Sequence, residues 1–348
     1  MIEPSNKIEE VIVIGGGPAG LAACVYLARA NLKPLLFAGS PPGGQLMLTS
    51  EVENYPGFDH ILGPELVAKL RKHAQTFGTR IVDQNILKVF FSTSHHEVGT
   101  IDKTYAAKTI LITTGAKALW LNLQSEQRLR GKGVSACATC DGFFFKNKVV
   151  AVIGGGDTAM EEALTLTKFA AKVYLIHRRD QFRASKIMQK RVLENPKIKV
   201  MWNTVVEEVL GENKIEGLKL ATEKPETENR ILKIDGLFLA IGHKPDTDLF
   251  KSAIELDGKG YIVTSDRYAL EFAKSVSKET EVKLLIPKEK VTMYKDRFDL
   301  NWVSATSVKG VFAAGDCVDY QFRQAGTAVG MGIAAALEIE RWLEIHNQ

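Results

Sequence analysis

The sequence contains few cysteines, four in 348 residues. So few in so long a chain exclude a secreted scaffold built on disulfides, and a reducing compartment is the expected setting. Long hydrophobic runs are missing as well, because apolar stretches such as residues 148–156 are far too short to cross a membrane. We therefore expect a cytoplasmic protein without a membrane segment.

A strong charge of one sign is also absent. The formal net charge is +4, and no block of Lys and Arg is interleaved with aromatic residues, so we expect no nucleic-acid partner. The opening residues, MIEPSNKIEE, have neither the basic and apolar regions of a secretory signal nor the arginines of a transit peptide. What remains is the composition of a folded soluble protein, 45% hydrophobic and 25% charged, and the length predicts two domains.

A first nucleotide-binding pattern lies near the N-terminus. The apolar run Val11–Ile14 predicts a strand buried on both faces, with a helix over Leu21–Ala30 and a second strand near Leu35–Phe37. The turn after the first strand carries G-x-G-x-x-G spacing at Gly15, Gly17 and Gly20. Such glycines permit a tight turn, close approach to a pyrophosphate, and close helix–strand packing. In this setting the turn predicts dinucleotide binding, and the alternative is an ordinary glycine-rich turn.

The pattern recurs in the middle of the chain. Val149–Ile153 predicts a strand, Val173–Ile176 predicts the next one, and the turn between them has G-x-G-x-x-A spacing at Gly154, Gly156 and Ala159. Two complete patterns indicate two dinucleotide sites rather than one.

The ends of the second strands distinguish the two nucleotides. After the later pattern comes a basic cluster, His177, Arg178, Arg179 and Arg183. Guanidinium groups suit the 2′-phosphate of NADP, so this site predicts NADPH, with a solvated basic loop as the alternative. The first pattern has no acid at the corresponding place, which leaves its nucleotide open.

Two later segments look like further strands of the first domain, at 108–116 and 310–317. Asp316 ends the second of them, where it could accept hydrogen bonds from a polyol or serve as the N-cap of the last helix. If both segments belong to the first domain, the second pattern is inserted into it. The predicted layout is 1–120 and 247–348 for one domain and 121–246 for the other.

The remaining question concerns Cys137 and Cys140, which lie in the stretch SACATCDGFFF. The C-x-x-C spacing fits a redox pair, half of a metal site, or two buried small side chains. Asp141 follows the pair and could be a turn former before Gly142.

The order of several motifs resembles the low-molecular-weight thioredoxin reductases, within the NADPH- and FAD-dependent pyridine nucleotide-disulfide oxidoreductase family. The motifs are GGGPAG, GGQL, EVENYPG, CATCDGFF, GGGDTAMEEA, HRRDQFRA, AIGHKPDT and GVFAAGD, and they span nearly the whole chain. The resemblance implies an α/β fold with two Rossmann-like dinucleotide-binding domains of three layers (ββα), in which the NADPH domain is inserted into a discontinuous FAD domain.

The resemblance also implies an activity and its cofactors. It predicts a homodimeric flavoprotein that carries electrons from NADPH through FAD and an enzyme dithiol to thioredoxin. The residues expected to line FAD are Gly15, Gly17, Pro18, Ala19, Gly20, Gly39, Gly44, Gln45, Leu46, Asn54, Thr114, Gly115, Gly315, Asp316, Gln324 and Ala325. Those expected to contact NADPH are Gly154, Gly156, Asp157, Thr158, Ala159, His177, Arg178, Arg179 and Arg183.

For the cysteines, the resemblance implies that Cys140 receives electrons from the flavin, that Cys137 attacks the thioredoxin disulfide, and that Asp141 is the general acid. No metal is expected, because Cys24 and Cys317 stand apart and offer no second pair. Three alternatives remain: a dithiol oxidase of the same fold, a ferredoxin–NADP reductase, and a flavoprotein redox sensor. The basic cluster argues against the first and the CATC motif against the second.

One segment does not fit the resemblance. Residues 266–304 are longer than the expected connection, and the stretches EVKLLIP and KVTMY within them predict two short strands of a surface hairpin. This insertion is either a decoration or a contact for a partner. The motif order further suggests a rotation between the two domains, with hinges near Leu119–Leu121 and Lys244–Thr247.

Overall fold

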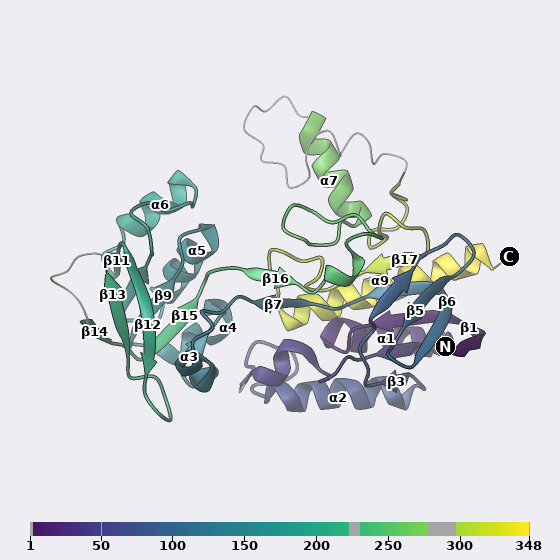
Figure 1. The fold of residues 1–348 in the computed structure, drawn as a ribbon, viewed down its shortest axis with the longest axis horizontal. Coiled ribbons are helices and arrows are strands. Elements are labelled where there is room, and N and C mark those ends of the chain that lie inside the picture. The colour runs from purple at the N-terminus through teal and green to yellow at the C-terminus, as the bar shows by residue number, and fades with distance from the viewer. Residues whose placement is uncertain (1–2, 50, 223–229, 277–296, 348) are drawn as a thin grey trace. The chain divides into compact units, whose positions relative to one another are not determined.

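The computed structural model describes residues 3–49, 51–222, 230–276 and 297–347 (Figure 1). The chain divides into two compact units. Unit 1 comprises Met1–Glu51, Tyr55–Lys117 and Lys244–Gln348, whereas unit 2 comprises Val52–Asn54 and Ala118–His243. Unit 1 is therefore assembled from chain on both sides of unit 2.

A seven-stranded sheet forms the centre of unit 1, in the order β3–β2–β1–β6–β5–β4 with β17 also paired to β6. Its strands are β1 (Glu3–Ile14), β2 (Leu35–Phe37), β3 (Arg80–Val82), β4 (Lys88–Phe90), β5 (His96–Gly99), β6 (Lys103–Ile112) and β17 (Val311–Ala313). The pairs β1·β2, β1·β6, β2·β3 and β6·β17 are parallel, and β4 and β5 are antiparallel additions. The predicted strands at Val11–Ile14 and Leu35–Phe37 are confirmed.

Alternation along β1 explains why this sheet is buried on both faces. Val11 and Val13 pack in one apolar cluster with helix residues such as Leu21 and Ile339, while Ile12 and Ile14 pack in another on the opposite face. The helices of unit 1 are α1 (Pro18–Arg29), α2 (Gly63–Thr76), α7 (Ser265–Val276) and α9 (Ala325–His346), with short 3₁₀ turns η1 (Gly44–Leu48) and η4 (Asp248–Phe250). Because α9 begins at Ala325 with Gln324 as its N-cap, the N-cap alternative for Asp316 is wrong.

Unit 2 has three layers. Its five-stranded parallel sheet has the order β11–β10–β9–β15–β8, from β8 (Val134–Ser135), β9 (Val149–Ile153), β10 (Lys172–Ile176), β11 (Ile198–Met201) and β15 (Gly236–Leu239). An antiparallel sheet contains β12 (Thr204–Leu210), β13 (Gly217–Thr222) and β14 (Arg230–Lys233). The helices are α3 (Gln124–Leu129), α4 (Ala138–Asp141), α5 (Asp157–Leu166) and α6 (Lys186–Leu193), with η2 at Gly142–Phe145.

The two faces of the parallel sheet explain these layers. Val150 and Val152 of β9 pack with the side chains of α5 and α6, whereas Ala151 packs in a second cluster with Leu218 and Leu220 of β13. A helical layer, a parallel sheet and an antiparallel sheet follow one another, so the predicted α/β class with ββα layers is confirmed.

The chain passes between the units at a two-stranded sheet of β7 (Ala116–Ala118) and β16 (His243–Pro245). Within the described residues, no helix is long and apolar enough to cross a membrane.

The structure corrects one expectation for the insertion. Its described beginning is the helix α7, which the sequence analysis did not predict. The two predicted strands, at 281–287 and 290–294, lie outside the described residues.

Candidate active site

The redox pair lies at the start of α4, shortly after β8. Cys137 is the N-cap of α4, with extended backbone angles, and its sulfur accepts a hydrogen bond from the Cys140 N–H at 3.1 Å. The two sulfurs are joined in a disulfide, and the Cα atoms are 5.3 Å apart. Both side chains are half-buried, so the disulfide is open to exchange from one side. This geometry confirms the dithiol–disulfide pair predicted from the CATC motif.

Asp141 ends α4 one residue after the pair. Burial raises the pKa of its carboxyl, and a hydrogen bond from Ser135 opposes that shift. Ser135 is itself buried, and its hydroxyl accepts the Cys137 N–H at 3.0 Å. A carboxyl that keeps its proton beside a disulfide can protonate a departing thiolate. The sequence analysis missed Ser135, although it lies two residues before the first cysteine.

The first glycine-rich turn joins β1 to α1. Gly15 has φ +117°, and a Cβ there would lie 2.2 Å from the Thr113 carbonyl oxygen; a Cβ on Gly20 would lie 2.0 Å from the Gly15 carbonyl oxygen. Gly17, in contrast, faces open space and caps α1 without a side-chain bond. The first helical N–H groups therefore face an open, uncrowded loop, the arrangement that receives a pyrophosphate.

Two unpartnered polar atoms lie at the ends of β6 and β17. Within the described part of the chain, Thr114 Oγ1 and Asp316 Oδ1 are buried without a hydrogen-bond partner. Ile112 of β6 pairs with Ala313 of β17, so the two side chains follow neighbouring strand ends. Burial and the nearby Asp319 raise the pKa of Asp316 to about 7. These orphaned groups fit the hydroxyl-rich chain of a flavin nucleotide, which would supply the missing hydrogen bonds.

The other residues predicted to line FAD lie in several different environments. Gly39, Gly44 and Gly115 all have positive φ, which places them in tight turns of unit 1. Leu46 packs against the core of unit 1. Asn54 is the exception, because residues 52–54 group with unit 2 and not with the first nucleotide turn.

The second glycine-rich turn joins β9 to α5 and repeats the first. A Cβ on Gly154 would lie 2.4 Å from the Ala240 carbonyl oxygen, whereas Gly156 faces open space and caps α5 without a side-chain bond. Asp157 accepts the Ser185 N–H at 2.8 Å, so its carboxylate helps to fix the loop that follows β10. The turn thus leaves its helix N-terminus accessible to a second nucleotide.

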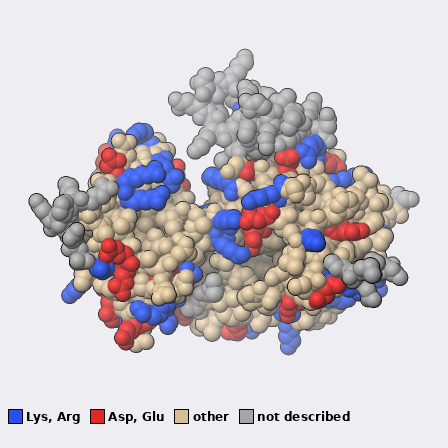
Figure 2. All heavy atoms as spheres, viewed as in Figure 1, with Lys and Arg blue, Asp and Glu red and all other residues tan. Residues whose placement is uncertain are grey.

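The basic cluster after β10 divides into two kinds of side chain. Arg178, Arg179 and Arg183 are exposed, and Figure 2 shows Lys and Arg side chains gathered on the visible face of unit 2 near α6. His177 is buried: its Nε2 lies 2.9 Å from the Gln181 carbonyl oxygen, and burial lowers its pKa. A Cβ on Gly155 would lie 2.2 Å from the His177 ring, so the neutral imidazole packs directly against the glycine turn. The three arginines, and not His177, are placed to meet an anion in solvent.

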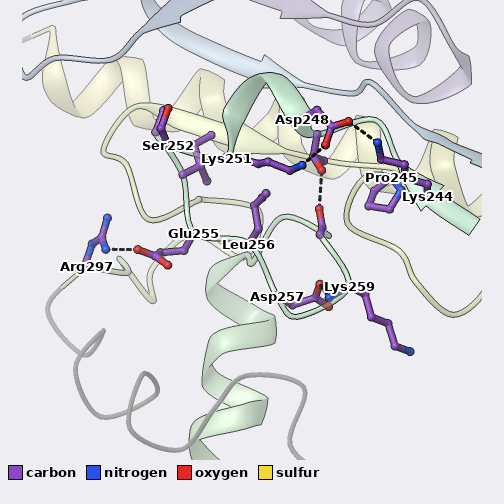
Figure 3. A pocket seen from close by; sticks show the side chains of 14 residues that line it. Lys244, Pro245, Asp248, Lys251, Ser252, Glu255, Leu256, Asp257, Lys259 and Arg297 are labelled. Carbon is purple, nitrogen blue, oxygen red and sulfur yellow. Dashed lines mark hydrogen bonds and ion pairs between the residues drawn. The ribbon is translucent and has the colours of Figure 1, made fainter.

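A pocket of about 510 Å³ in unit 1 is separate from these features. Figure 3 shows three of its cations turned toward acids, with Lys244 and Lys251 on Asp248 and Arg297 on Glu255. None of its lining residues is a predicted site residue.

Comparisons with known proteins agree with this geometry. The pattern of the pyridine nucleotide-disulphide oxidoreductase family matches residues 9–277. A thioredoxin reductase of Rickettsia felis is 44% identical over 339 residues, which cover 96% of this chain and 98% of that protein. A bifunctional thioredoxin reductase/thioredoxin of Mycobacterium leprae is 43% identical over 343 residues, or 98% of this chain and 67% of that protein. The crystal structure of thioredoxin reductase from Streptococcus pyogenes MGAS5005 has a TM-score of 0.82 at 35% identity and covers 98% of this chain and 100% of its own.

The matches extend over both units and include both nucleotide turns and the disulfide. They show an oxidoreductase and imply a flavin and a pyridine nucleotide as its cofactors. The resemblance stated from the sequence motifs is confirmed. The chain belongs to the pyridine nucleotide-disulphide oxidoreductase family and, within it, to the thioredoxin reductases.

Proposed function

We propose that the protein is an NADPH-dependent thioredoxin-disulfide reductase that uses FAD and the Cys137/Cys140 dithiol. The observation that carries this proposal is the half-buried disulfide with Asp141 directly after it. The disulfide precedes β9 in the same unit as the second nucleotide turn, and the first nucleotide turn lies in the other unit.

The choice of NADPH over NADH rests on the loop after β10. Its three exposed arginines follow the strand end where the adenosine ribose of a bound dinucleotide lies. Their guanidinium groups can each offer paired N–H donors to a phosphate, and the loop is held against the glycine turn by the Arg183 N–H, 2.7 Å from the Gly155 carbonyl oxygen. A 2′-phosphate is the natural anion for this position.

The choice of FAD for unit 1 rests on the open turn at Gly17 and on the orphaned Thr114 and Asp316. Bound flavin would pass two electrons from the nicotinamide to the disulfide. The chain itself supplies the groups that hold the nucleotides and the groups that manage thiols and protons.

The roles proposed for the two cysteines are those that the family resemblance implies. Once reduced, Cys137 as thiolate attacks one sulfur of the thioredoxin disulfide, which forms a mixed disulfide and releases a thiolate. Asp141 protonates that leaving group. Cys140 then gives its proton to the Asp141 carboxylate and attacks the Cys137 sulfur, which breaks the mixed disulfide and re-forms the enzyme disulfide. The second thioredoxin sulfur leaves as a thiolate and takes up that proton, which frees reduced thioredoxin. Two electrons and two protons pass to the substrate in each cycle.

A protein substrate suits the surroundings of the pair. Phe143, three residues after Cys140, is 59% exposed and offers a partner an apolar contact. The relative from Mycobacterium leprae carries both activities of its printed name in one chain, which supports thioredoxin as the partner. We further propose a cytoplasmic homodimer, for which light scattering should give twice the chain mass of 38.4 kDa.

The test is an anaerobic titration of the FAD-loaded protein. NADPH, but not NADH, should bleach the flavin absorbance band at about 450 nm. Oxidised thioredoxin should then restore it. A Cys137→Ser variant should bleach normally and fail to recover.

Other outcomes would point elsewhere. Recovery in Cys137→Ser would exclude the dithiol path. Recovery by oxygen alone would favour a dithiol oxidase, and no bleaching at all would favour a redox sensor.

A further inference from the structure

The helix α7 brings one arginine into the interior of unit 1. Arg267, in its first turn, is only 7% exposed. The turn is held firmly, because the Ser265 N–H donates to the Ala305 carbonyl at 2.9 Å and the Tyr268 ring stacks on Phe298 with centroids 4.7 Å apart. The helix belongs to the insertion that the resemblance does not explain, and none of its residues has a part in the proposed electron path.

Asp257 holds the guanidinium in one orientation. The Arg267 Nη2 forms an ion pair with the Asp257 carboxylate, whose side chain is fully buried. The other carboxylate oxygen accepts the backbone N–H groups of Lys259 at 2.8 Å and Tyr261 at 2.9 Å. A planar guanidinium tied to a carboxylate that is itself fixed by the backbone has little freedom to turn.

This guanidinium lies over the Tyr320 ring, with its central carbon 4.5 Å from the ring centroid. Lys259 Nζ lies 5.9 Å from the same ring. The Arg267 Nε and Nη1 are buried and have no hydrogen-bond partner in the described part of the chain, so the guanidinium acts through Nη2 and through its face. Two cations on one partly buried aromatic ring hold that ring in place.

Tyr320 begins the loop that leads to α9. Asp319 fixes this loop, because its carboxylate accepts the N–H groups of Gln321, Phe322 and Arg323, each at 2.8 Å. The loop ends at Gln324, which forms a capping box with Thr327 at the start of α9.

A second contact completes this arrangement. The Tyr261 ring lies 6.2 Å from the Tyr320 ring, and the Arg323 side chain lies near the Tyr261 hydroxyl. Arg323 has φ +49°, a left-handed conformation that a side chain adopts only when its surroundings require it. The conformation just before Gln324 and Ala325 is therefore set by contacts from Tyr261, Asp319 and Tyr320.

We propose that Arg267 is a positioning residue for the flavin: by stacking on Tyr320 it holds the 319–324 loop so that Gln324 and Ala325 meet bound FAD. In this proposal the inserted helix α7 has a function, because it stabilises the 319–324 loop. This inference rests on the proposed FAD site.

The test compares FAD release from variant holoenzymes on dilution, followed by the rise of free flavin fluorescence. Tyr320→Leu removes the ring and leaves the buried ion pair; Arg267→Lys keeps the charge and loses the flat face. Each should raise the FAD dissociation constant about tenfold, the order expected for a partly buried cation–π contact. Tyr320→Phe keeps the ring and should restore wild-type retention.

A matched control exists in unit 2. Arg130 forms an ion pair with the buried Glu126, and its guanidinium carbon lies 3.9 Å from the Trp120 ring centroid. Arg130→Lys makes the same change in the same kind of setting and should leave FAD release unchanged.

If Tyr320→Leu and Arg267→Lys both retain FAD as the wild-type protein does, the proposed role of Arg267 is wrong. An equal loss of FAD from Arg130→Lys would also contradict it. If the wild-type protein itself retains no FAD, the proposed function fails as well, and this distinguishes the two failures.

Discussion

Asp141, the proposed proton donor, has a carboxyl that is desolvated by burial. Desolvation raises its pKa, so the protonated form persists to a higher pH than for an exposed aspartate. A proton donor is needed when the attack by Cys137 releases one thioredoxin sulfur as a thiolate, and Asp141, which we propose for this role, follows Cys140 directly. We infer that this residue links the pH dependence of turnover to the dithiol step and not to flavin reduction.

An Asp141→Asn variant tests this link. Because the amide cannot donate a carboxyl proton, thioredoxin turnover should fall by about a hundredfold, within the usual range for a general acid. In the wild-type protein, turnover should decline as pH rises through the raised pKa, and the variant should lack that decline. Bleaching of the flavin by NADPH serves as the control and should be unchanged. An Asn variant with the wild-type pH profile would contradict the assignment.

At the scale of elements, the loop between β10 and α6 contains two kinds of basic side chain: exposed ones that we propose bind the nucleotide, and a buried one that packs against the glycine turn. The sequence predicted one basic cluster, and the structure exposes three arginines while it buries His177 between the glycine turn and the rings of Phe182 and Trp202. The H-R-R spacing could not show this, because the burial of His177 depends on Trp202, which follows β11 and is distant in the sequence.

The double variant Arg178→Gln/Arg183→Gln should raise the KM for NADPH by about a hundredfold, since two charge-assisted contacts to a phosphate are lost. The KM for NADH should change little. Steady-state kinetics with both nucleotides make the measurement, and Arg191→Gln, an exposed arginine of α6, is the control. Equal losses for the two nucleotides would show that the loop does not read the 2′-phosphate.

The strand β5 contains a buried titratable group that should make the fold less stable in acid. His96 is 2% exposed, and burial lowers its pKa to about 4. Its Nδ1 has no partner among the residues that the structure describes. Between pH 6.5 and about 4 the unfolded chain binds a proton that the folded chain does not, so stability falls as the pH falls through this window.

His96→Gln, which has no titrating group, should lose less stability on acidification than the wild-type protein. The difference should approach about 3 kcal/mol between pH 7 and pH 4, from the size of the pKa shift. Urea unfolding of both proteins at several pH values measures it. Parallel loss of stability in the two proteins would mean that His96 does not carry the effect.

Other elements show how far the sequence could lead. Strands such as Val149–Ile153 were predicted at their observed bounds, because a continuous apolar run before a glycine turn has few alternatives. The helix α7 was missed, since two β-rich stretches further along suggested a hairpin for the whole insertion. Ser135 and the Arg267–Tyr320 contact were missed because they depend on tertiary packing. The hinges predicted near Leu119–Leu121 and Lys244–Thr247 stay predictions.

For the whole molecule, the four cysteines fall into two classes, a disulfide pair and two buried thiols, which a thiol reagent can distinguish. Cys137 and Cys140 form the disulfide, while Cys24 and Cys317 are fully buried, and burial raises the pKa of the Cys317 thiol to about 11. Buried thiols with raised pKa values react slowly.

The native oxidised protein should therefore show no fast-reacting thiol with an aromatic disulfide reagent. NADPH should add two, from the opened pair, and denaturation of the reduced protein should reveal all four cysteines of the sequence. Fast thiols in the untreated native protein would contradict the observed pairing.

The position of β17 has a consequence for how the chain is made. This strand pairs with β6, Val311 opposite Ile110, and the Ala118–His243 part of unit 2 is translated between the two. Domains tend to form as they leave the ribosome, so unit 2 can mature while the earlier part of unit 1 still waits for its last strand. Asp316 and Gln324 are translated after β17. The proposed flavin site can therefore be completed only after this strand has been made, and a nascent chain stalled before residue 310 should contain a folded unit 2 and an incomplete unit 1.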